Sequence, residues 1–368
     1  MGLNCGIVGL PNVGKSTLFN ALTQTAAAQA ANYPFCTIDP NIGLVDVPDQ
    51  RLDKLAELAH SAKKINAQLE IVDIAGLVKK ASEGEGLGNQ FLGHIREVDA
   101  ILHVLRCFED DDVTHVEGSI NPIRDAEIVE TELMLADLDS LQKRKVALEK
   151  KHRIDKGPEI GLTLSLVDRA IDSLAKSIPA RKITLNDLEE IKLFKELQLL
   201  TSKPVLYVCN VSEGEILSGN KFTAQVAELV KKENSRLVVV SAAIEAEIAL
   251  LDNDNEKHEY LASIGLTEAG LSRMIHEGYQ LLDLITFFTA GEKESRAWTI
   301  KRGAKAPEAA GVIHTDFQRG FICAETVAYN DYVSLGGELP SKNAGKVRLE
   351  GKEYILKDGD IMHFRFNI

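Results

Sequence analysis

The chain has 368 residues, 45% of them hydrophobic, and 42 basic against 55 acidic side chains give a formal net charge of −13. This length predicts two or three domains with their own cores, and no apolar stretch reaches the roughly 18 residues of a membrane span. No secretory leader is recognisable and the five scattered cysteines form no CxxC pair, so we expect a cytoplasmic protein with reduced thiols, without membrane contact, disulfides or a zinc ribbon.

The first predicted elements enclose a phosphate-binding motif. An apolar run at residues 5–8 predicts a buried strand, residues 9–16 read Gly-Leu-Pro-Asn-Val-Gly-Lys-Ser, and a helical pattern follows at 17–22. In such a GxxxxGKS loop the backbone N–H groups face the phosphates, the lysine reaches the β- and γ-phosphates, and the serine hydroxyl ligates magnesium. The sequence predicts a nucleoside triphosphate site with Mg²⁺, whose loop contacts come from Asn12, Val13, Gly14, Lys15, Ser16 and Thr17.

Two later positions extend the phosphate side of this site. Asp73 ends a strand-like run at residues 67–73 and begins Asp-Ile-Ala-Gly, the DxxG motif of switch GTPases. In that motif the Asp holds magnesium through water, and the N–H of the Gly, here Gly76, meets the γ-phosphate. Thr37 lies between the two motifs, where its hydroxyl completes the magnesium shell. We therefore expect Ser16, Thr37 and Asp73 to form the metal site.

Apolar strand-like runs alternate with helical stretches through the nucleotide-binding part of the chain. The runs are residues 5–10, 42–47, 67–73, 100–107, 205–210 and 237–241. Nearly continuous apolar strands separated by helices predict a mostly parallel sheet that is covered on both faces. The fold class is therefore α/β, with a GTPase-like nucleotide-binding domain in residues 1–127 and 201–283.

Residues 128–200 interrupt this alternation with a helical pattern. Apolar residues recur at helical spacing over residues 128–153, with acidic side chains early and basic ones late, as the helix dipole favours. A turn at 155–158, a second helical stretch at 160–178 and a third that begins at Asn186 or Asp187 follow. We predict a helical insertion, an antiparallel hairpin of coiled-coil character with too few heptads for a long dimerising coiled coil. A helical arm that folds onto the core without a partner is the alternative.

From residue 284 to 368 the pattern predicts a small mixed-sheet domain. Short segments that alternate apolar and polar residues stand between Gly-containing turns, at 297–300, 321–327, 346–349, 352–356 and 362–366. The whole acidic excess lies outside 128–200 and 284–368, so charge does not oppose local docking of these parts on nucleic acid. Basic and aromatic residues interleave here as on an RNA-facing surface, with an aromatic core under a solvated basic face as the alternative: Trp298, Lys301, Arg302, Lys305, His314, Phe317, Arg319 and Phe321.

The base-binding element departs from the GTPase pattern. GTPases place NKxD after a buried strand, and its Asp accepts two hydrogen bonds from guanine. Here the motif reads Asn210-Val-Ser-Glu, in which Val211 replaces the Lys and Glu213 is one methylene longer than Asp. Because a lost hydrogen-bond match can cost several orders of magnitude in discrimination, we do not expect a preference for GTP. Ser241 and Ala242 end a later strand, as the base-contacting turn of GTPases does.

The residues that orient the attacking water also differ from those of many GTPases. Leu77 follows the DxxG motif where many GTPases carry Gln, and an aliphatic side chain cannot position water, so we expect slow intrinsic hydrolysis. Lys15 supplies positive charge to the phosphate oxygens. His115, in the acid-rich loop at residues 109–118, is the candidate for the missing role, with a solvated or regulatory histidine as the alternative. His103 lies in an apolar strand pattern and is expected in the core.

Together these motifs resemble those of the YchF family, the Obg-related branch of the translation-factor P-loop GTPases. The resemblance also rests on residues 32–38, 73–78, 84–91, 106–108, 210–213, 313–317 and 320–321, and so spans almost the whole chain. It implies a GTPase-like core, a helical insertion and a C-terminal TGS domain of β-grasp fold. It also implies ATP as the preferred nucleotide, a catalytic histidine at the position of His115, and association with ribosomes and stress responses.

The predicted function is a ribosome-associated molecular switch that binds ATP with Mg²⁺ and slowly hydrolyses it to ADP and phosphate in preference to GTP. The ribosomal partner is the large subunit or the whole ribosome, and RNA contact through the TGS domain is a further expectation. Two alternatives stay open. One is a true GTPase with relaxed base specificity, and the other is a nucleotide-sensing module that binds ribosomes or RNA and whose turnover is incidental.

Overall fold

The computed structural model describes residues 4–30, 42–74, 87–110, 118–251 and 253–367. The chain forms two compact units: Met1–Gly43 with Glu70–Met274, and Leu44–Leu69 with Ile275–Ile368. The division predicted from the sequence, into residues 1–127 with 201–283, 128–200, and 284–368, stays a prediction. The structure adds that residues 44–69 belong to the second unit, although they stand in the nucleotide-binding part of the sequence.

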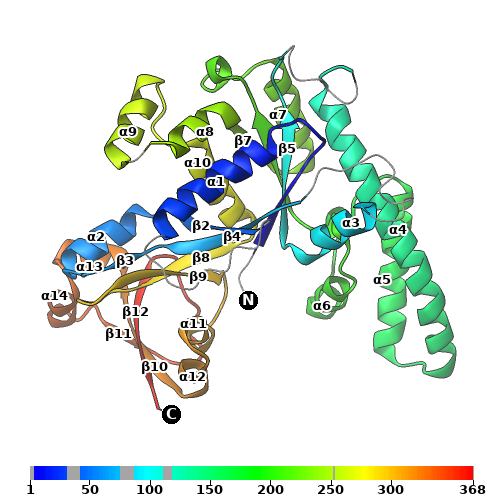
Figure 1. Ribbon diagram of the computed structural model, residues 1–368. Coiled ribbons are helices and arrows are strands. Elements are labelled where there is room, and N and C mark those ends of the chain that lie inside the picture. Colours follow the sequence, from blue (N-terminus) through cyan, green and yellow to red (C-terminus); the bar gives the residue numbers. More distant parts are fainter. Residues whose placement is uncertain (1–3, 31–41, 75–86, 111–117, 252, 368) are drawn as a thin grey trace. The chain divides into compact units, whose positions relative to one another are not determined.

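The first sheet has six strands in the order β2-β4-β1-β5-β6-β7 (Figure 1). Strand β1 pairs in parallel with β4 and β5, and the pairs β5–β6 and β6–β7 are parallel too. All six predicted strand runs are confirmed, as β1 (Asn4–Val8), β2 (Ile42–Val47), β4 (Ala67–Asp73), β5 (Ala100–Arg106), β6 (Val205–Asn210) and β7 (Arg236–Val240). Every residue of β5 and β6 is buried, as expected for central strands covered on both faces.

Helices and short 3₁₀ turns connect these strands. They are α1 (Lys15–Ala30), α3 (Leu87–Glu97), α4 (Pro122–Ile154), α5 (Pro158–Ala175), η1 (Ala180–Lys182), α6 (Leu188–Glu196), η2 (Leu200–Ser202), η3 (Glu213–Glu215), α7 (Lys221–Glu233), α8 (Ala242–Ala249), α9 (Asp254–Ser263) and α10 (Gly270–Leu281). Helix α1 packs against α8, which brings the helix after the phosphate loop beside the helix after β7. Helix α10 continues from the first unit into the second.

The helical insertion predicted between residues 128 and 200 is present and has its own apolar core. Helix α4 begins after Asn121, whose side chain accepts the N–H of Arg124, and the basic residues of its last turn complement the helix dipole. Helices α4 and α5 run side by side as a hairpin (Figure 1). Asp187 is the cap of α6, since its side chain accepts the N–H of Glu190. The core contains Leu141, Leu166, Val167, Ala170, Leu174, Ala180, Leu193, Phe194, Leu197 and Leu199.

The second unit contains a mixed sheet in the order β11-β10-β12-β8-β9-β3. Its strands are β3 (Lys64–Ile65), β8 (Leu284–Thr289), β9 (Ser295–Lys301), β10 (Phe321–Ala328), β11 (Arg348–Glu350) and β12 (Asp360–Phe366), and its helices are α2 (Gln50–Leu58), α11 (Ala306–Ile313), α12 (Thr315–Arg319), α13 (Tyr329–Leu335) and α14 (Glu338–Asn343). Strands β8–β9, β10–β11 and β10–β12 are antiparallel, whereas β8–β12 and β3–β9 are parallel. The C-terminal unit thus has the predicted mixed-sheet, β-grasp character.

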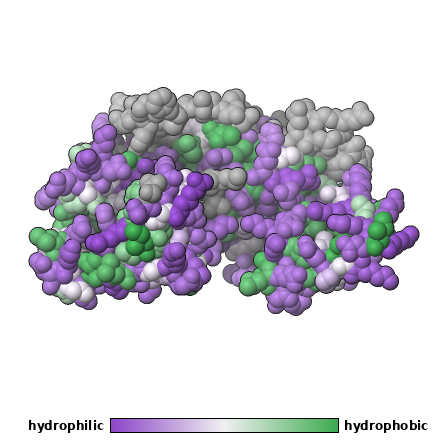
Figure 2. All heavy atoms as spheres, turned by 90° about the horizontal axis from the view of Figure 1, so that it is seen from below, coloured by the Kyte–Doolittle hydropathy of each residue, from purple (hydrophilic) through white to green (hydrophobic). Residues whose placement is uncertain are grey.

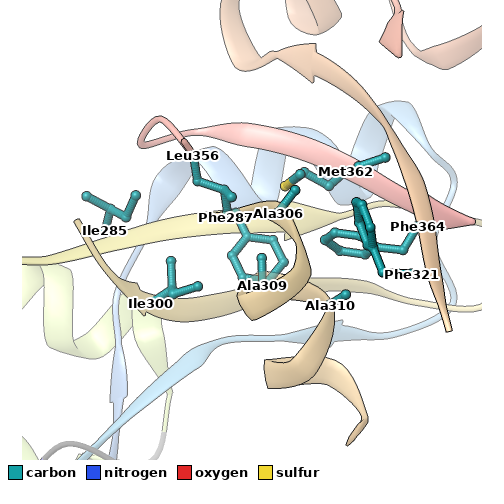
Figure 3. Close-up of a cluster of buried hydrophobic side chains, with 11 residues drawn as sticks. Ile285, Phe287, Ile300, Ala306, Ala309, Ala310, Phe321, Leu356, Met362 and Phe364 are labelled. Carbon is teal, nitrogen blue, oxygen red and sulfur yellow. The ribbon is translucent and has the colours of Figure 1, made fainter. Parts of the chain in front are cut away.

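Helix α11 covers one face of this sheet. Figure 3 shows three alanines of α11 turned toward apolar side chains of β8, β9, β10 and β12. Small alanines let the helix approach the strands closely, and the larger rings fill the space around them. The buried cluster consists of Ile285, Phe287, Ile300, Ala306, Ala309, Ala310, Phe321, Ala324, Leu356, Met362 and Phe364.

One predicted strand of the C-terminal part is wrong. Residues 352–356 form turns rather than a strand, with a single bridge between Lys305 and Ile355. The backbone groups of this stretch are already used, because the N–H of Tyr354 donates to Gly351 and the N–H of Leu356 donates to Ala304. Alternation of apolar and polar residues over five positions fits this folded-back stretch as well as it fits a strand.

Hydrophilic residues occupy most of the face shown in Figure 2, with small hydrophobic groups between them. This agrees with a chain in which 26% of residues are charged. None of the helices in the described ranges combines the length and the hydropathy that crossing a bilayer requires.

Candidate functional site

The loop between β1 and α1 has a backbone that requires glycine. Gly14 has a φ of 97°, and a Cβ atom there would lie 2.3 Å from Nδ2 of Asn210. A Cβ atom on Gly9 would lie 2.5 Å from the carbonyl oxygen of Val104. Asn12 also has a left-handed backbone, with a φ of 62°. The loop therefore curls tightly against β5 and β6 and leads directly into the N-terminus of α1, where free N–H groups and the helix dipole favour an anion.

Lys15 and Asp73 form the charged centre of this region. The Nζ atom of Lys15 donates to the carbonyl of Leu10 at 2.7 Å, and the side chain is 7% exposed. Burial lowers the pKa of Lys15 to about 8, and the nearby Asp73 carboxylate offsets part of that effect. Burial likewise raises the pKa of Asp73, and the Lys15 charge opposes the rise. At neutral pH the ammonium is still protonated, so the site presents a buried cation.

The oxygen atoms available near this centre fit a magnesium ion. Oδ1 of Asp73 is buried and has no hydrogen-bond partner within the described ranges. Such an orphaned carboxylate oxygen is what a bound cation or its water would satisfy. Ser16 lies exposed in the first turn of α1, and its hydroxyl is a candidate for a second oxygen ligand. Hydroxyl and carboxylate oxygens are the donors that Mg²⁺ prefers.

Asn210 joins the phosphate loop to the turn after β7. It ends β6, it is 3% exposed, and its Nδ2 donates to the carbonyl of Val13 at 2.9 Å. Its Oδ1 accepts the N–H of Ala242 at 2.9 Å. Both halves of the amide are therefore used, each on a different loop, and the two loops are held at a fixed separation.

The remaining base-side residues surround this amide. The N–H of Val211 donates to Val240, and its side chain is 3% exposed, so an apolar residue packs where the GTPase motif carries Lys. Glu213 is exposed in η3. The hydroxyl of Ser241 is buried and has no partner among the residues that the structure describes. An unsatisfied buried hydroxyl beside Ala242 is available to a polar ligand.

The structure thus brings together two sets of predicted positions that lie up to 230 residues apart. Lys15 lies near Asp73 on the phosphate side, and Asn210 joins Val13 to Ala242 on the other side. The other predicted residues of this region are neighbours of these in the chain: Asn12, Gly14, Ser16, Thr17, Val211, Ser241 and the exposed Glu213. Three predicted positions, Thr37, Gly76 and His115, lie outside the described residues.

A buried network next to the site was not identified from the sequence. His103 lies in the core, as predicted, and its ring stacks on Tyr207 with 5.7 Å between centroids. The hydroxyl of Tyr207 donates to Glu233 at 2.8 Å, and Arg181 pairs with Glu130 at 2.8 and 3.0 Å. Arg181 also lies 3.6 Å from Glu233. The network joins β6 and α7 to the helical insertion. Its partners lie too far apart in the chain for a local sequence pattern to predict.

His103 makes the stability of the first unit depend on pH. Burial, with the charges of Arg181 and Lys15, lowers its pKa to about 3, so the unfolded chain binds a proton that the folded protein does not. The contribution of His103 to the free energy of unfolding is fully present above the unfolded pKa of roughly 6.5 and is lost as pH falls toward 3. At pH 5 about 2 kcal/mol of it is lost.

We expect the free energy of unfolding of His103→Phe, measured with urea, to fall by about 2 kcal/mol less than that of wild type between pH 7 and pH 5. His94→Phe, at an exposed position, should keep the wild-type dependence; equal slopes in all three proteins would contradict the prediction.

The interleaved basic and aromatic residues of the C-terminal part are largely structural. Phe321 is buried, and Trp298 and Phe317 pack against the same apolar cluster. Arg302 pairs with Asp283, and Lys305 pairs with Glu353. The solvated basic face over an aromatic core therefore describes most of these residues, and Lys301, Arg302, Lys305 and Arg319 are all exposed.

Two family models match the chain. One, named for the C-terminal domain of YchF GTPases and described as a protein of unknown function, matches residues 284–367. The other, described as a 50S ribosome-binding GTPase, matches residues 4–150. The first covers most of the mixed-sheet part, and the second covers the phosphate loop, Asp73 and most of α4.

Curated relatives and a solved structure match over their full lengths. A protein of Bacillus subtilis named ribosome-binding ATPase YchF is 54% identical over 100% of both chains, and its namesake in Escherichia coli O157:H7 is 51% identical over 100% of both. The structure described as the Schizosaccharomyces pombe YchF GTPase has a TM-score of 0.89 at 38% identity, with 99% of this chain and 98% of that chain covered. The names differ in the nucleotide that they assign.

Proposed function

The chain belongs to the YchF family, and from this premise we propose that it is a ribosome-binding molecular switch that binds ATP with magnesium and hydrolyses it slowly. The observation that carries the proposal is the double hydrogen bond of Asn210, which couples the phosphate loop to the base-side turn. One ligand with phosphates at one end and a base at the other spans these two loops.

On the phosphate side, Lys15 and the N-terminus of α1 supply positive charge. Lys15 is held by the Leu10 carbonyl in a buried position and is charged at neutral pH, which makes its attraction to a phosphate stronger than that of a solvated lysine. Ser16, Asp73 and, from the sequence, Thr37 are the proposed oxygen ligands of magnesium, which would neutralise phosphate charge when bound.

On the base side, the proposed preference for ATP rests on Val211 and Glu213. Guanine recognition in the NKxD motif needs a carboxylate placed to accept two N–H groups at once. Here the carboxylate is one methylene longer and lies exposed in η3, and buried Val211 cannot support it as a lysine does. Adenine has no second N–H at that edge, so replacing the Asp of the motif by Glu213 costs an adenine nucleotide no hydrogen bond. The buried hydroxyl of Ser241 is available as a further polar contact.

Slow turnover is proposed because the residue after the DxxG motif is Leu77, which cannot orient water. Lys15 stabilises charge on the phosphate oxygens, and His115 is proposed to position the attacking water or its proton. Both Leu77 and His115 lie outside the described residues, so this part of the proposal rests on sequence. Slow hydrolysis suits a switch, since the ATP-bound state must persist long enough for a partner to bind it.

The partner and location are proposed from the relatives. Their printed names describe ribosome binding. We propose a cytoplasmic location because ribosomes are found there. RNA contact through the second unit is proposed from its exposed basic side chains Lys301, Arg302, Lys305 and Arg319.

Nucleotide competition tests the base preference directly. In calorimetry with Mg²⁺ we expect ATP to bind at least about tenfold more tightly than GTP, because the guanine match is broken. Glu213→Asp should move the ratio toward GTP, while Glu228→Asp on the exposed face of α7 should leave it unchanged. Equal or tighter GTP binding by wild type would contradict the preference.

Turnover assays with and without ribosomes distinguish a switch from a sensor. If ribosomes do not stimulate hydrolysis by wild type and His115→Ala hydrolyses ATP as fast as wild type, the results favour a pure sensor.

A further inference from the structure

Residues 44–69 stand in the sequence between Thr37 and Asp73, two proposed magnesium ligands, and in the structure they belong to the second unit. This segment, here called the strap, holds most of β2, all of α2 and β3, and the start of β4. We infer that the strap is a conformational link through which nucleotide binding alters the sheet of the second unit. The inference rests on the proposed nucleotide site and adds a route that leads out of it.

Backbone pairing builds the strap into the second sheet. Strand β3 pairs in parallel with β9, and the N–H of Ala62 donates to the carbonyl of Glu292 at 2.8 Å. The hydroxyl of Ser61 donates to the carbonyl of Gly291 at 2.7 Å and lies 2.8 Å from the hydroxyl of Ser295. Ser295 is fully buried, so its hydroxyl meets water only when the strap separates from β9.

Side chains of α2 hold the strap to the same sheet at β8. Nη1 of Arg51 lies 2.6 Å from Oδ2 of Asp358, and the guanidinium stands 5.2 Å from the ring centroid of Phe288. Asp358 also accepts the N–H of Thr286 at 2.9 Å, so one carboxylate joins α2 to β8. Leu52 is fully buried beneath the helix. The strap is therefore attached in two places: its backbone pairs with β9, and Arg51 pairs with Asp358, which is hydrogen-bonded to β8.

The other end of the strap leads to the phosphate site through continuous strands. Asp46 of β2 accepts the side-chain amides of Asn66 and Gln68 at 3.1 and 3.0 Å, which ties the two ends of the strap to each other. Strand β4 then runs without a break to Asp73, and from Glu70 onward it pairs with β1, the strand that leads into the phosphate loop. We expect a displacement at Asp73 to reach the strap along this hydrogen-bonded strand, over about 13 Å.

This arrangement gives a reciprocal expectation. If nucleotide binding changes the affinity of the second unit for a partner that contacts β8 and β9, then that partner changes the affinity for nucleotide by the same factor. A partner on the second unit would thus sense the nucleotide without touching it.

Hydrogen–deuterium exchange of the full chain, with and without magnesium and a non-hydrolysable ATP analogue, tests the link. In wild type we expect the analogue to slow exchange in peptides that cover the phosphate loop and in peptides that cover residues 291–301. In the double variant Arg51→Ala/Ser61→Ala, the response of residues 291–301 should fall to less than half of wild type. Its phosphate-loop response should persist, and its affinity for the analogue should stay within about tenfold.

Arg302→Ala is the matched control. It also removes an arginine and its ion pair with Asp283 in the second unit, but it leaves the strap untouched. This variant should keep the wild-type response at residues 291–301. Ser61→Ala alone serves as a milder variant if the double variant unfolds, and it should show a reduced response in the same peptides.

Two results would overturn the link. One is a wild-type protein whose phosphate loop responds to the analogue while residues 291–301 do not. The other is a folded double variant, or Ser61→Ala in its place, that responds as Arg302→Ala does. If the analogue does not bind and no peptide responds, the proposed function itself is wrong and the link falls with it, so the two failures are distinguishable.

Discussion

Replacing Lys15 by methionine should lower kcat for ATP hydrolysis by about 100- to 1,000-fold, the effect expected when one preorganised charge or donor on the reacting group is removed. Methionine keeps the apolar stem of the side chain and removes only the ammonium. In the folded protein Lys15 is 7% exposed and its ammonium donates to the Leu10 carbonyl, so water would not replace the ammonium effectively. We expect ATP affinity to fall as well, because the ground-state phosphates lose the same cation.

Single-turnover kinetics and calorimetry measure the two effects separately, and thermal unfolding monitors the fold. Lys54→Met provides the control, since Lys54 is an exposed lysine in a surface ion pair with Glu57, and such pairs contribute little. It should keep wild-type turnover within about twofold. A loss of less than tenfold in a folded Lys15→Met protein would show that this lysine does not act on the phosphates.

Asn210→Ala should weaken ATP binding by about 30- to 1,000-fold, which corresponds to roughly 2 to 4 kcal/mol. The change leaves the Val13 carbonyl and the Ala242 N–H without their partners. Holding both loops in the bound arrangement then costs about 1 to 3 kcal/mol for each unpaired buried group, and this cost weakens binding. It also opens space next to Gly14, whose backbone approaches the amide closely. Because the two loops then move independently, affinity for the phosphates and for the base should fall together.

Titration with ATP and with inorganic triphosphate distinguishes this account from a purely local effect. Asn20→Ala, at an exposed position of α1, is the matched control and should bind both ligands as wild type does. If Asn210→Ala lost affinity for ATP but bound triphosphate normally, the amide would serve the base alone. Unchanged ATP affinity would remove Asn210 from the site altogether.

Much of the site follows from short sequence patterns because each is a local physical requirement. Gly14 must adopt a positive φ, and Lys15 must follow it at the start of a helix, so the loop is recognisable within eight residues. The apolar runs of β1, β5 and β6 are equally local, since a strand buried on both faces must be largely apolar. The turn at residues 352–356 was the exception, because five alternating residues do not distinguish a strand from a chain that folds back.

Short sequence patterns predict the chemistry of this protein: a phosphate loop, a carboxylate proposed to hold magnesium, a base motif that departs from NKxD, and the order of strands and helices that carries them. Which distant groups meet depends on the tertiary structure. The two bonds of Asn210 and the attachment of residues 44–69 to the second unit depend on partners that lie more than 30, and in places more than 300, residues apart. A two-residue strand such as β3 or a single ion pair such as Arg51–Asp358 has no periodicity of its own, because its stability comes from the surface it joins and not from its neighbours in the chain.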